Sequence, residues 1–374
     1  MKKILFVANT SWYLFNFRLL LIKQLQGQGY TVFVLAPHDE YVQYLTKERI
    51  ICHHLKINRK GINVLSNFLT LISIYYYYHK IQPDIIIHFT IKPVIFGTLI
   101  ARICTKTKVI NNVTGLGYVF IGTTFVHTFL RPFVKAMYRC VLRLSDLLIF
   151  QNKDDRSFFI KSKIIADSNP PSVLISGSGV DLDKFQKKNI RTDRLKVHFI
   201  LVARMLYDKG ILEYVEAAKV VQKEYKNTVF HLLGDIDEGN PTAIPLNIIN
   251  EWVNQKIIIY HGMVDDVCPF LENSDVFVLP SFREGLSKSI IEAMAMELPI
   301  ITTDVPGCRE TVIQYGNGLL IRSKNIPDLV NAMIYMIKNT DKLVLMGKLS
   351  REIAKYKFNV ELINNEYIQY VETI

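Results

Sequence analysis

Residues 280–311, PSFREGLSKSIIEAMAMELPIITTDVPGCRET, contain the pattern from which the fold of this chain is inferred. The apolar run 276–279 predicts a strand that ends at Pro280 and opens into a polar loop holding Glu284. A helix then begins near Ser287, whose hydroxyl can cap the free backbone amides. Its apolar residues follow helical spacing: Ile290, Ile291, Met294, Ala295 and Leu298. The stretch therefore predicts a strand, a loop and a helix, with a further strand at 300–302.

Two carboxylates give this stretch a chemical meaning. Glu292 lies on the first turns of the predicted helix, eight positions after Glu284. The free amides at a helix N-terminus attract phosphate, a carboxylate one turn away can accept two ribose hydroxyls, and a loop carboxylate can meet a second polyol. Phosphate, ribose and sugar together describe a sugar nucleotide. The alternative is two surface glutamates around an ordinary turn, since this spacing alone is common by chance.

The length and composition favour a large protein with two cores. A chain of 374 residues suits two domains of roughly 180 residues, and a hydrophobic fraction of 49% argues against disorder. The five cysteines are scattered and form no CxxC pair. We therefore expect reduced thiols in a cytoplasmic protein, with neither a zinc site nor disulfides.

The first residues, MKKILFVANTSWYLF, combine a basic start with a short apolar run. The run stops at Asn9 without a small-residue cleavage site, so a first core strand is expected rather than a signal peptide. No apolar stretch reaches the ~18 residues that cross a bilayer.

The charge is divided unevenly along the chain. Residues 1–190 hold 25 Lys and Arg against 10 Asp and Glu, whereas the remainder holds 20 against 24. A basic half beside a slightly acidic half suggests that the first faces something anionic. A phospholipid surface or a diphosphate-bearing acceptor fits better than nucleic acid, because no nucleic-acid recognition motif is present.

The first half alternates strand-like runs with helical patterns, which indicates a parallel sheet covered on both faces. We predict strands at 4–8, 31–36, 85–88, 108–112, 147–150 and 173–175, and helices at 18–26 and 64–79. Ligands of such sheets bind beyond the carboxyl ends of the strands. The acceptor-side candidates there are Asn16, His88, Thr114 and Gly115. His88 has the alternative of a satisfied core histidine, and the missing GxGxxG argues against a dinucleotide oxidoreductase.

Residues 125–143 carry a basic stripe. Its residues recur every four positions: Arg131, Lys135, Arg139 and Arg143. Aromatic and apolar residues, Phe125 and Phe129 among them, accompany the stripe with similar spacing. A basic-aromatic helix is a candidate for binding a membrane surface or a lipid diphosphate. The alternative is an ordinary amphipathic helix with a solvated edge.

The second half repeats the alternation, with strands expected at 197–202, 229–233, 257–260, 276–279, 300–302 and 319–321. Arg204 and Lys209 follow the first of these strands. Two cations beside the Glu284 loop can neutralise a diphosphate and stabilise the charge that develops as it departs. A pair of surface cations is the alternative.

The chain as a whole resembles the family 4 glycosyltransferases, which have the GT-B fold. The resemblance covers most of the chain, and residues 280–311 carry it most strongly. It also rests on the R-x4-K-G run at 204–210, the G-V-D run at 179–181 and the PGCRET run at 306–311. The fold class implied is α/β, two Rossmann-like domains facing each other across a cleft. Residues 1–190 would bind the acceptor, 191–355 the nucleotide sugar, and 356–374 would form a helix that packs back on the first domain.

The resemblance also implies roles for single residues. Arg204, Lys209 and Glu284 are the catalytic candidates. The donor-binding candidates are Glu292, Gly234, Gly262, Met263, Val264, Gly285, Leu286 and Ser287. Gly307 and Glu310 would close the site, although Glu310 has the alternative of a solvated helix-start residue.

Two details bear on the chemistry that the resemblance implies. The pairs Asp181/Asp183 and Asp235/Asp237 each form a D-x-D, which holds a metal in another glycosyltransferase architecture. Both pairs here lie in contexts like those of the metal-independent family, so no metal and no cofactor are expected. Many members carry a histidine where this chain has Thr114, so no catalytic histidine is assigned.

The acceptor half is similar to bacterial enzymes that extend undecaprenyl-diphosphate-linked sugars, above all N-acetylgalactosaminyltransferases acting on lipid-linked bacillosamine. The implied function is a retaining transfer of an N-acetylhexosaminyl group from a UDP-sugar to a lipid-linked saccharide. Such reactions build O-antigen, capsule or protein glycans. The expected partners are the donor, the acceptor and an anionic membrane on whose inner face the protein would be peripheral. Two alternatives stay open: a sugar-nucleotide epimerase and a catalytically silent binding subunit.

Overall fold

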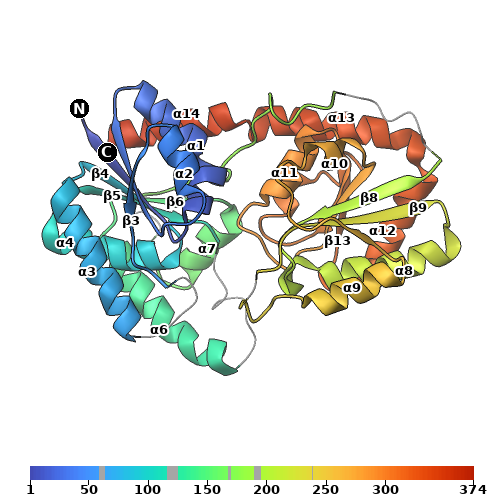
Figure 1. The fold of residues 1–374 in the computed structure, drawn as a ribbon, viewed down its shortest axis with the longest axis horizontal. Helices are drawn as coiled ribbons and strands as arrows, with labels where there is room; N and C mark the ends of the chain where they lie inside the picture. The colour runs from blue at the N-terminus through green and yellow to red at the C-terminus, as the bar shows by residue number, and fades with distance from the viewer. Residues whose placement is uncertain (59–63, 116–124, 167–169, 189–194, 238) are drawn as a thin grey trace. The chain divides into compact units, whose positions relative to one another are not determined.

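The computed structural model describes residues 1–58, 64–115, 125–166, 170–188, 195–237 and 239–374, and gives backbone but not side-chain placement for Val64 and 125–130. The chain divides into two compact units, drawn in Figure 1. Unit 1 comprises Met1–Ser178 and Leu362–Ile374, and unit 2 comprises Gly179–Glu361. Each unit is a parallel α/β sheet, as predicted.

The strands of unit 1 lie in the order β3-β2-β1-β4-β5-β6-β7, and all pairs are parallel. Their bounds are β1 Lys3–Val7, β2 Thr31–Ala36, β3 Ile51–His54, β4 Ile85–Phe89, β5 Lys108–Val113, β6 Leu147–Phe150 and β7 Ser172–Leu174. The helices are α1 Ser11–Gly27, α2 Val42–Lys47, α3 Val64–Ile81, α4 Thr98–Cys104, α6 Phe125–Leu142, α7 Lys153–Lys161 and α14 Val360–Thr373, with a short π-helical segment η1 at Pro93–Gly97.

Alternate residues of β1 enter two different apolar cores of unit 1. Ile4 and Phe6 of β1 pack in one core with α1 and α14. Leu5 and Val7 of the same strand pack in the other core with α3 and α4. This arrangement follows from the two-residue period of side chains along a strand, and it explains why the strands read as continuous apolar runs.

The strands of unit 2 lie in the order β10-β9-β8-β11-β12-β13, again parallel throughout. Their bounds are β8 Val197–Val202, β9 Thr228–Leu233, β10 Ile259–Tyr260, β11 Val276–Leu279, β12 Ile300–Thr303 and β13 Gly318–Ile321. The helices are α8 Ile211–Glu224, α9 Leu246–Asn254, α10 Cys268–Glu272, α11 Lys288–Ala295, α12 Ile326–Lys338 and α13 Thr340–Lys357, with 3-10 turns η2 Tyr207–Lys209 and η3 Arg309–Thr311.

The end of the chain differs from the single helix predicted for 356–374. Helix α13 ends at Lys357, and α14 begins at Val360. Phe358 is buried in the core of unit 2, whereas Ile363 is buried in the core of unit 1. The interruption allows consecutive apolar residues to enter two different cores, which a continuous helical spacing could not reveal.

Candidate functional site

The donor-side candidates converge at the carboxyl edge of the sheet in unit 2. Arg204 and Lys209 follow β8, and Glu284 follows β11. Strands β8 and β11 are neighbours at the point where the order of the sheet reverses. Such switch points are where open α/β sheets bind ligands, because the loops leaving the two strands turn in opposite directions. The glycines predicted to bind the donor follow β9, β10 and β11 at this same edge.

An ion pair spans the switch point. The Nζ of Lys209 lies 2.7 Å from Oε1 of Glu284, and the two side chains are only 15% and 13% exposed. A partly desolvated pair attracts more strongly than one in water and orders both side chains. The structure thus brings together two of the three predicted catalytic residues.

Backbone contacts fix the two loops that carry this pair. The N–H of Phe282 donates to the carbonyl of Asp208 over 2.8 Å, and the hydroxyl of Ser281 donates to the same carbonyl over 3.1 Å. Gly210 has φ +72°, and a Cβ at this position would lie 2.1 Å from the carbonyl oxygen of Pro280. Only glycine permits both the left-handed conformation and this close approach.

Arg204 is held separately from that pair. Its Nη1 lies 2.9 Å from Oδ2 of Asp237, and its side chain is 49% exposed. Asp237 also accepts from the side-chain amide of Asn240. In the sequence, Asp237 stands out only as half of a D-x-D pair, and its pairing with Arg204 was not predicted. The sequence does place the carboxylate of Asp237 shortly after β9, the strand that follows Arg204 in the chain. Its spacing, however, does not identify Arg204 as its partner.

Helix α11 begins as predicted. The Ser287 hydroxyl accepts a hydrogen bond from the N–H of Ile290 over 3.4 Å, which caps the helix. Glu292 lies on the following turn with its side chain 14% exposed, and its carboxylate is 3.7 Å from Nζ of Lys288. Burial raises the pKa of Glu292, and Lys288 and Lys184 offset part of that increase. Neither lysine was predicted from the sequence.

The loop after β12 lies directly against the Glu284 loop. The N–H of Glu284 donates to the carbonyl of Pro306, and a Cβ on Gly307 would lie 2.4 Å from the carbonyl oxygen of Glu284. The N–H of Gly307 in turn donates to Oε2 of Glu310 over 2.8 Å. Gly307 and Glu310 therefore shape the backbone beneath Glu284, which is a positioning role.

The remaining donor-side candidates come from the loops after β9 and β10. The N–H of Gly234 donates to the carbonyl of Gly262 over 2.8 Å, and a Cβ on Gly234 would collide with the carbonyl of Ala203. Met263 is 52% exposed, whereas Val264 packs against the core of unit 2. Of these residues, Met263 thus offers an exposed side chain at the sheet edge.

The two D-x-D pairs have other partners. Oδ1 of Asp181 accepts from the N–H groups of Asp183 and Lys184, as in a capped turn. Asp235 accepts from the N–H of Ile236, and Asp237 pairs with Arg204. Across the described part of the chain, no cluster of three His, Cys, Asp or Glu side chains is arranged to hold a metal ion.

His88 proves to be a core residue of unit 1. Its side chain is fully buried, with Nε2 2.6 Å from the hydroxyl of Tyr78 and Nδ1 2.8 Å from Oδ1 of Asn111. Burial lowers the pKa of His88 to about 4, opposed by the Asn111 contact. The alternative considered from the sequence is therefore the one observed, and His88 is no longer a candidate for contacting an acceptor.

The other acceptor-side candidates lie at the carboxyl edge of unit 1. Asn16 is on α1, where its side-chain amide donates to the carbonyl of Trp12. Thr114 and Gly115 follow β5 and are half-buried, with φ +134° at Gly115. The rest of that predicted turn, including Leu116 and Gly117, lies outside the described residues.

Helix α6 carries three of the four residues of the predicted basic stripe, because it ends one residue before Arg143. Two of these cations, Lys135 and Arg139, contact α7 or the residues that follow it. Nε of Arg139 donates to the carbonyl of Lys163 over 2.7 Å, just beyond the end of α7. Nζ of Lys135 lies 5.5 Å from the ring centroid of Phe158 on α7. Cations near a helix C-terminus stabilise its unpaired carbonyls, so this part of the stripe supports α7. The side chains of Phe125 and Phe129 lie outside the described residues.

Comparisons with known proteins agree with the two-unit architecture. The model of the family described as "Glycosyl transferase 4-like" matches residues 3–152. The model described as "Glycosyl transferases group 1" matches residues 196–339. Each model thus covers most of one unit.

Several relatives span most of the chain. An N,N'-diacetylbacillosaminyl-diphospho-undecaprenol alpha-1,3-N-acetylgalactosaminyltransferase from Campylobacter jejuni is 27% identical over 99% of this chain and 98% of its own. A UDP-Gal:alpha-D-GlcNAc-diphosphoundecaprenol alpha-1,3-galactosyltransferase from Escherichia coli is 27% identical over 83% and 82%. Among solved structures, HepE from Anabaena in complex with UDP and glucose has a TM-score of 0.78 at 17% identity, with both chains covered completely. This likeness shows a shared fold.

Proposed function

Because the chain is a glycosyltransferase that joins a glycosyl transferase 4-like domain to a group 1 domain, we propose its donor, acceptor and mechanism. The donor is a UDP-sugar, with an N-acetylhexosaminyl group to transfer. The acceptor is a saccharide carried on undecaprenyl diphosphate, and the product enters a surface polysaccharide or a glycan. The transfer retains the configuration at the anomeric carbon.

The pairing of Lys209 with Glu284 across the switch point is the observation that carries this proposal. The bond from the anomeric carbon to the donor diphosphate breaks, and a bond from that carbon to the acceptor oxygen forms. Lys209 and Arg204 stabilise the negative charge that develops on the departing diphosphate. The proton of the acceptor hydroxyl passes to a diphosphate oxygen, so this mechanism uses no protein base and no metal.

The two glutamates position the donor in this mechanism. Glu284 accepts hydrogen bonds from hydroxyls of the donor sugar. Its ion pair with Lys209 fixes the position of the sugar relative to the diphosphate. Glu292 accepts the two ribose hydroxyls from its partly buried position on α11. Fixing the reacting atoms in one geometry accelerates transfer without covalent attack. The alternative, in which Glu284 is a nucleophile, predicts that Glu284→Gln abolishes turnover while donor binding persists.

The activities of the relatives support the proposed acceptor. The Campylobacter jejuni and Escherichia coli enzymes act on sugars linked to undecaprenyl diphosphate, and a third relative from Staphylococcus aureus is a capsular polysaccharide biosynthesis glycosyltransferase. The strongly basic first half of the chain suits an acceptor that bears a diphosphate. We place the enzyme on the inner face of the cytoplasmic membrane.

Thermal stabilisation by UDP, GDP and ADP tests the donor site. A ligand at one hundred times its Kd raises the free energy of unfolding by about 2.7 kcal/mol. We expect a shift that is selective for UDP and that Glu292→Ala removes. A screen of UDP-sugars with lipid-linked acceptors then identifies the sugar. Turnover of a GDP- or ADP-sugar alone would refute the proposed donor, and interconversion of free UDP-sugars without acceptor would indicate an epimerase.

A further inference from the structure

Helix α3 presents an exposed apolar face. Six of its large side chains, which we call the α3 face, are between 47% and 68% exposed: Leu65, Phe68, Leu69, Ile72, Tyr75 and Tyr76. Their positions advance by three, one, three, three and one residues, so they share one side of the helix. The opposite side, with Ile74 and Tyr78, is fully buried against the sheet of unit 1. The α3 face is therefore an apolar surface on a helix whose core contacts are already satisfied.

This exposure is not scattered. Isolated apolar residues on a protein surface are ordinary, whereas a contiguous patch marks an interaction site. The patch runs from Leu65 to Tyr76, a rise of about 16 Å along the helix axis. The neighbouring helix α4 contacts α3 and carries Ile103, which is 70% exposed.

The charged residues of α3 and of the segments that flank it in the sequence are all basic. The sequence contains no acidic residue between Glu48 and Asp84, a stretch that includes the whole of α3. Lys80 ends the helix, with its Nζ 5.7 Å from the ring centroid of Tyr76. The exposed Lys56 lies beside α3, where its backbone N–H donates to the hydroxyl of Ser73. An apolar stripe bordered by cations complements a surface with an apolar interior and anionic groups at its boundary.

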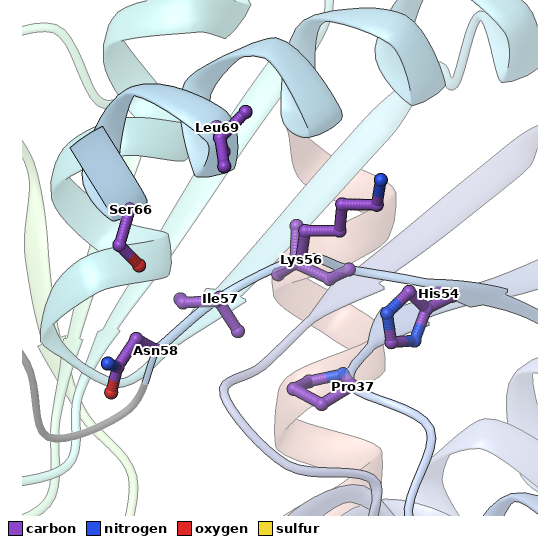
Figure 2. Close-up of a pocket in the computed structure, with 8 residues that line it drawn as sticks. Pro37, His54, Lys56, Ile57, Asn58, Ser66 and Leu69 are labelled. Carbon is purple, nitrogen blue, oxygen red and sulfur yellow. The ribbon is translucent and has the colours of Figure 1, made fainter.

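A cavity opens at the start of the same helix. It has a volume of about 510 Å³ and is lined by residues that include Leu69, Ser66, Lys56 and Asn58. Figure 2 shows Leu69 and Ser66 on α3 above the segment that carries Lys56 and Asn58. Polar and cationic groups thus adjoin the apolar stripe at one of its ends, an arrangement that suits a phospholipid head group next to its acyl chains.

We propose that the α3 face docks unit 1 on an anionic lipid bilayer, with the apolar stripe in the acyl boundary and Lys56 and Lys80 at the phosphates. The helix lies in the plane of the interface, since no helix in the described part of the chain is long and apolar enough to cross a membrane. Tyrosines at one end of the stripe suit this depth, because their rings combine an apolar body with a polar tip. This inference rests on the proposed function, whose acceptor is held in a membrane, and assigns the contact to α3 instead of α6.

Flotation with vesicles tests this contact without nucleotide or turnover. We expect the wild-type protein to float with vesicles of phosphatidylglycerol and phosphatidylethanolamine, and more weakly with phosphatidylcholine alone. The double variant Phe68→Glu, Ile72→Glu should lower the partition coefficient by at least about tenfold, because it places two charges in the apolar stripe. The matched control is Leu345→Glu, Leu349→Glu on α13, which makes the same change at exposed leucines four residues apart. It should leave flotation unchanged.

Two further variants separate the possible contacts. Lys56→Glu with Lys80→Glu should weaken binding to the anionic vesicles mainly at low salt, since surface charges are screened at high salt. Charge reversal at Arg131 on α6 and at Arg143, just beyond the end of α6, should have a smaller effect than the α3 variants. Loss of flotation in the α6 variant with normal flotation of Phe68→Glu, Ile72→Glu would overturn the assignment to α3.

The same proteins distinguish failure of this inference from failure of the proposed function. If the wild type floats with none of the vesicles yet UDP still stabilises it, the α3 proposal is wrong and the donor proposal stands. If the wild type floats with vesicles but no nucleotide stabilises it, the donor proposal is wrong and the α3 proposal stands. A change in sedimentation coefficient between the wild type and the α3 variant, without vesicles, would show that a second copy of the chain covers the face and would overturn the lipid assignment.

Discussion

The guanidinium of Arg18 lies over the ring of Tyr367, 5.1 Å from its centroid, and over the ring of Phe89 at 4.7 Å. Arg18 is only 2% exposed, and no carboxylate in the described residues forms an ion pair with it. Two aromatic faces and the hydroxyl of Tyr13 are its neighbours. Cation–π attraction is strongest for such a desolvated cation, so this contact fastens the last helix of the chain to the first.

Tyr367→Ala should destabilise unit 1 by about 3–5 kcal/mol, because it leaves a large cavity and removes one aromatic face from a buried cation. The free energy of unfolding in urea and the rate of proteolysis near the C-terminus measure the effect. Gln369→Ala is the control, since Gln369 is exposed on the same helix. A cost below 1 kcal/mol for Tyr367→Ala would mean that α14 is held mainly by its other apolar residues.

Lys209→Ala should lower kcat by about 10²–10³-fold, the usual cost of removing a group that stabilises developing negative charge. Lys219→Ala is a matched control, because Lys219 forms an ion pair of 2.6 Å with Glu216 at a more exposed position. That change should leave turnover unaltered. Equal losses in both variants would contradict a special role for the pair at the switch point.

Glu292→Gln should weaken UDP binding by about tenfold or more, since the amide accepts the ribose hydroxyls less well than a carboxylate. Burial raises the pKa of Glu292. Wild-type affinity should therefore decline, as the pH is lowered, at a higher pH than for an ordinary glutamate, while the Gln variant shows no such decline. Calorimetric titration with UDP across this pH range measures both effects. Identical pH profiles would exclude Glu292 as the titrating group.

Gly210→Ala should destabilise unit 2 more than Gly262→Ala. The two glycines have nearly the same φ, +72° and +68°, so the left-handed strain of about 1–2 kcal/mol is common to both changes. A Cβ at Gly210 meets the carbonyl of Pro280, whereas nothing lies within 4 Å of a Cβ at Gly262. Overpacking adds about 1–3 kcal/mol at the first position alone, and urea unfolding measures the difference. Equal costs would show that the loop at Gly210 can yield.

The pH dependence of unit 1 should reflect His88. Its pKa is about 4 in the folded protein against an ordinary 6.5. The unfolded chain gains this proton as the pH falls below 6.5, while the folded chain gains it only near pH 4. Stability is therefore lost across this window, up to roughly 3 kcal/mol, and is unaffected above it. Urea unfolding followed by Trp12 fluorescence in a Trp252→Phe background measures the slope, which His88→Gln should flatten.

The strands with two buried faces could be predicted from the sequence because their apolar runs are continuous. The predicted bounds of Thr31–Ala36, Leu147–Phe150, Val197–Val202 and Val276–Leu279 are those of the structure. Strand β3 was missed, since it is an edge strand with the sequence Ile-Cys-His-His and partly exposed residues. Helix α1 begins seven residues before the predicted start because Thr10 caps an aromatic-rich first turn.

The backbone of the candidate site could be predicted because glycines and a capping serine mark it. Its ion pairs could not, since Lys209–Glu284 and Arg204–Asp237 join residues far apart in the chain. The exposure of the α3 face could not be predicted from the sequence either. An apolar run such as the one from Leu65 to Tyr78 predicts a buried helix. Only the packing in the structure shows which side of that helix stays exposed to solvent.

The division of unit 1 between both ends of the chain has a consequence for biosynthesis. Its sheet is complete by Leu174, yet the core of that sheet includes Ile363, Tyr367 and Val371. A ribosome that has finished the first half has therefore not yet produced the helix that seals it. The apolar surface of unit 1 that α14 covers therefore stays exposed on the nascent chain while all of unit 2 is synthesised. A chain that lacks its last thirteen residues would lose the helix that covers the core of unit 1, the unit synthesised first.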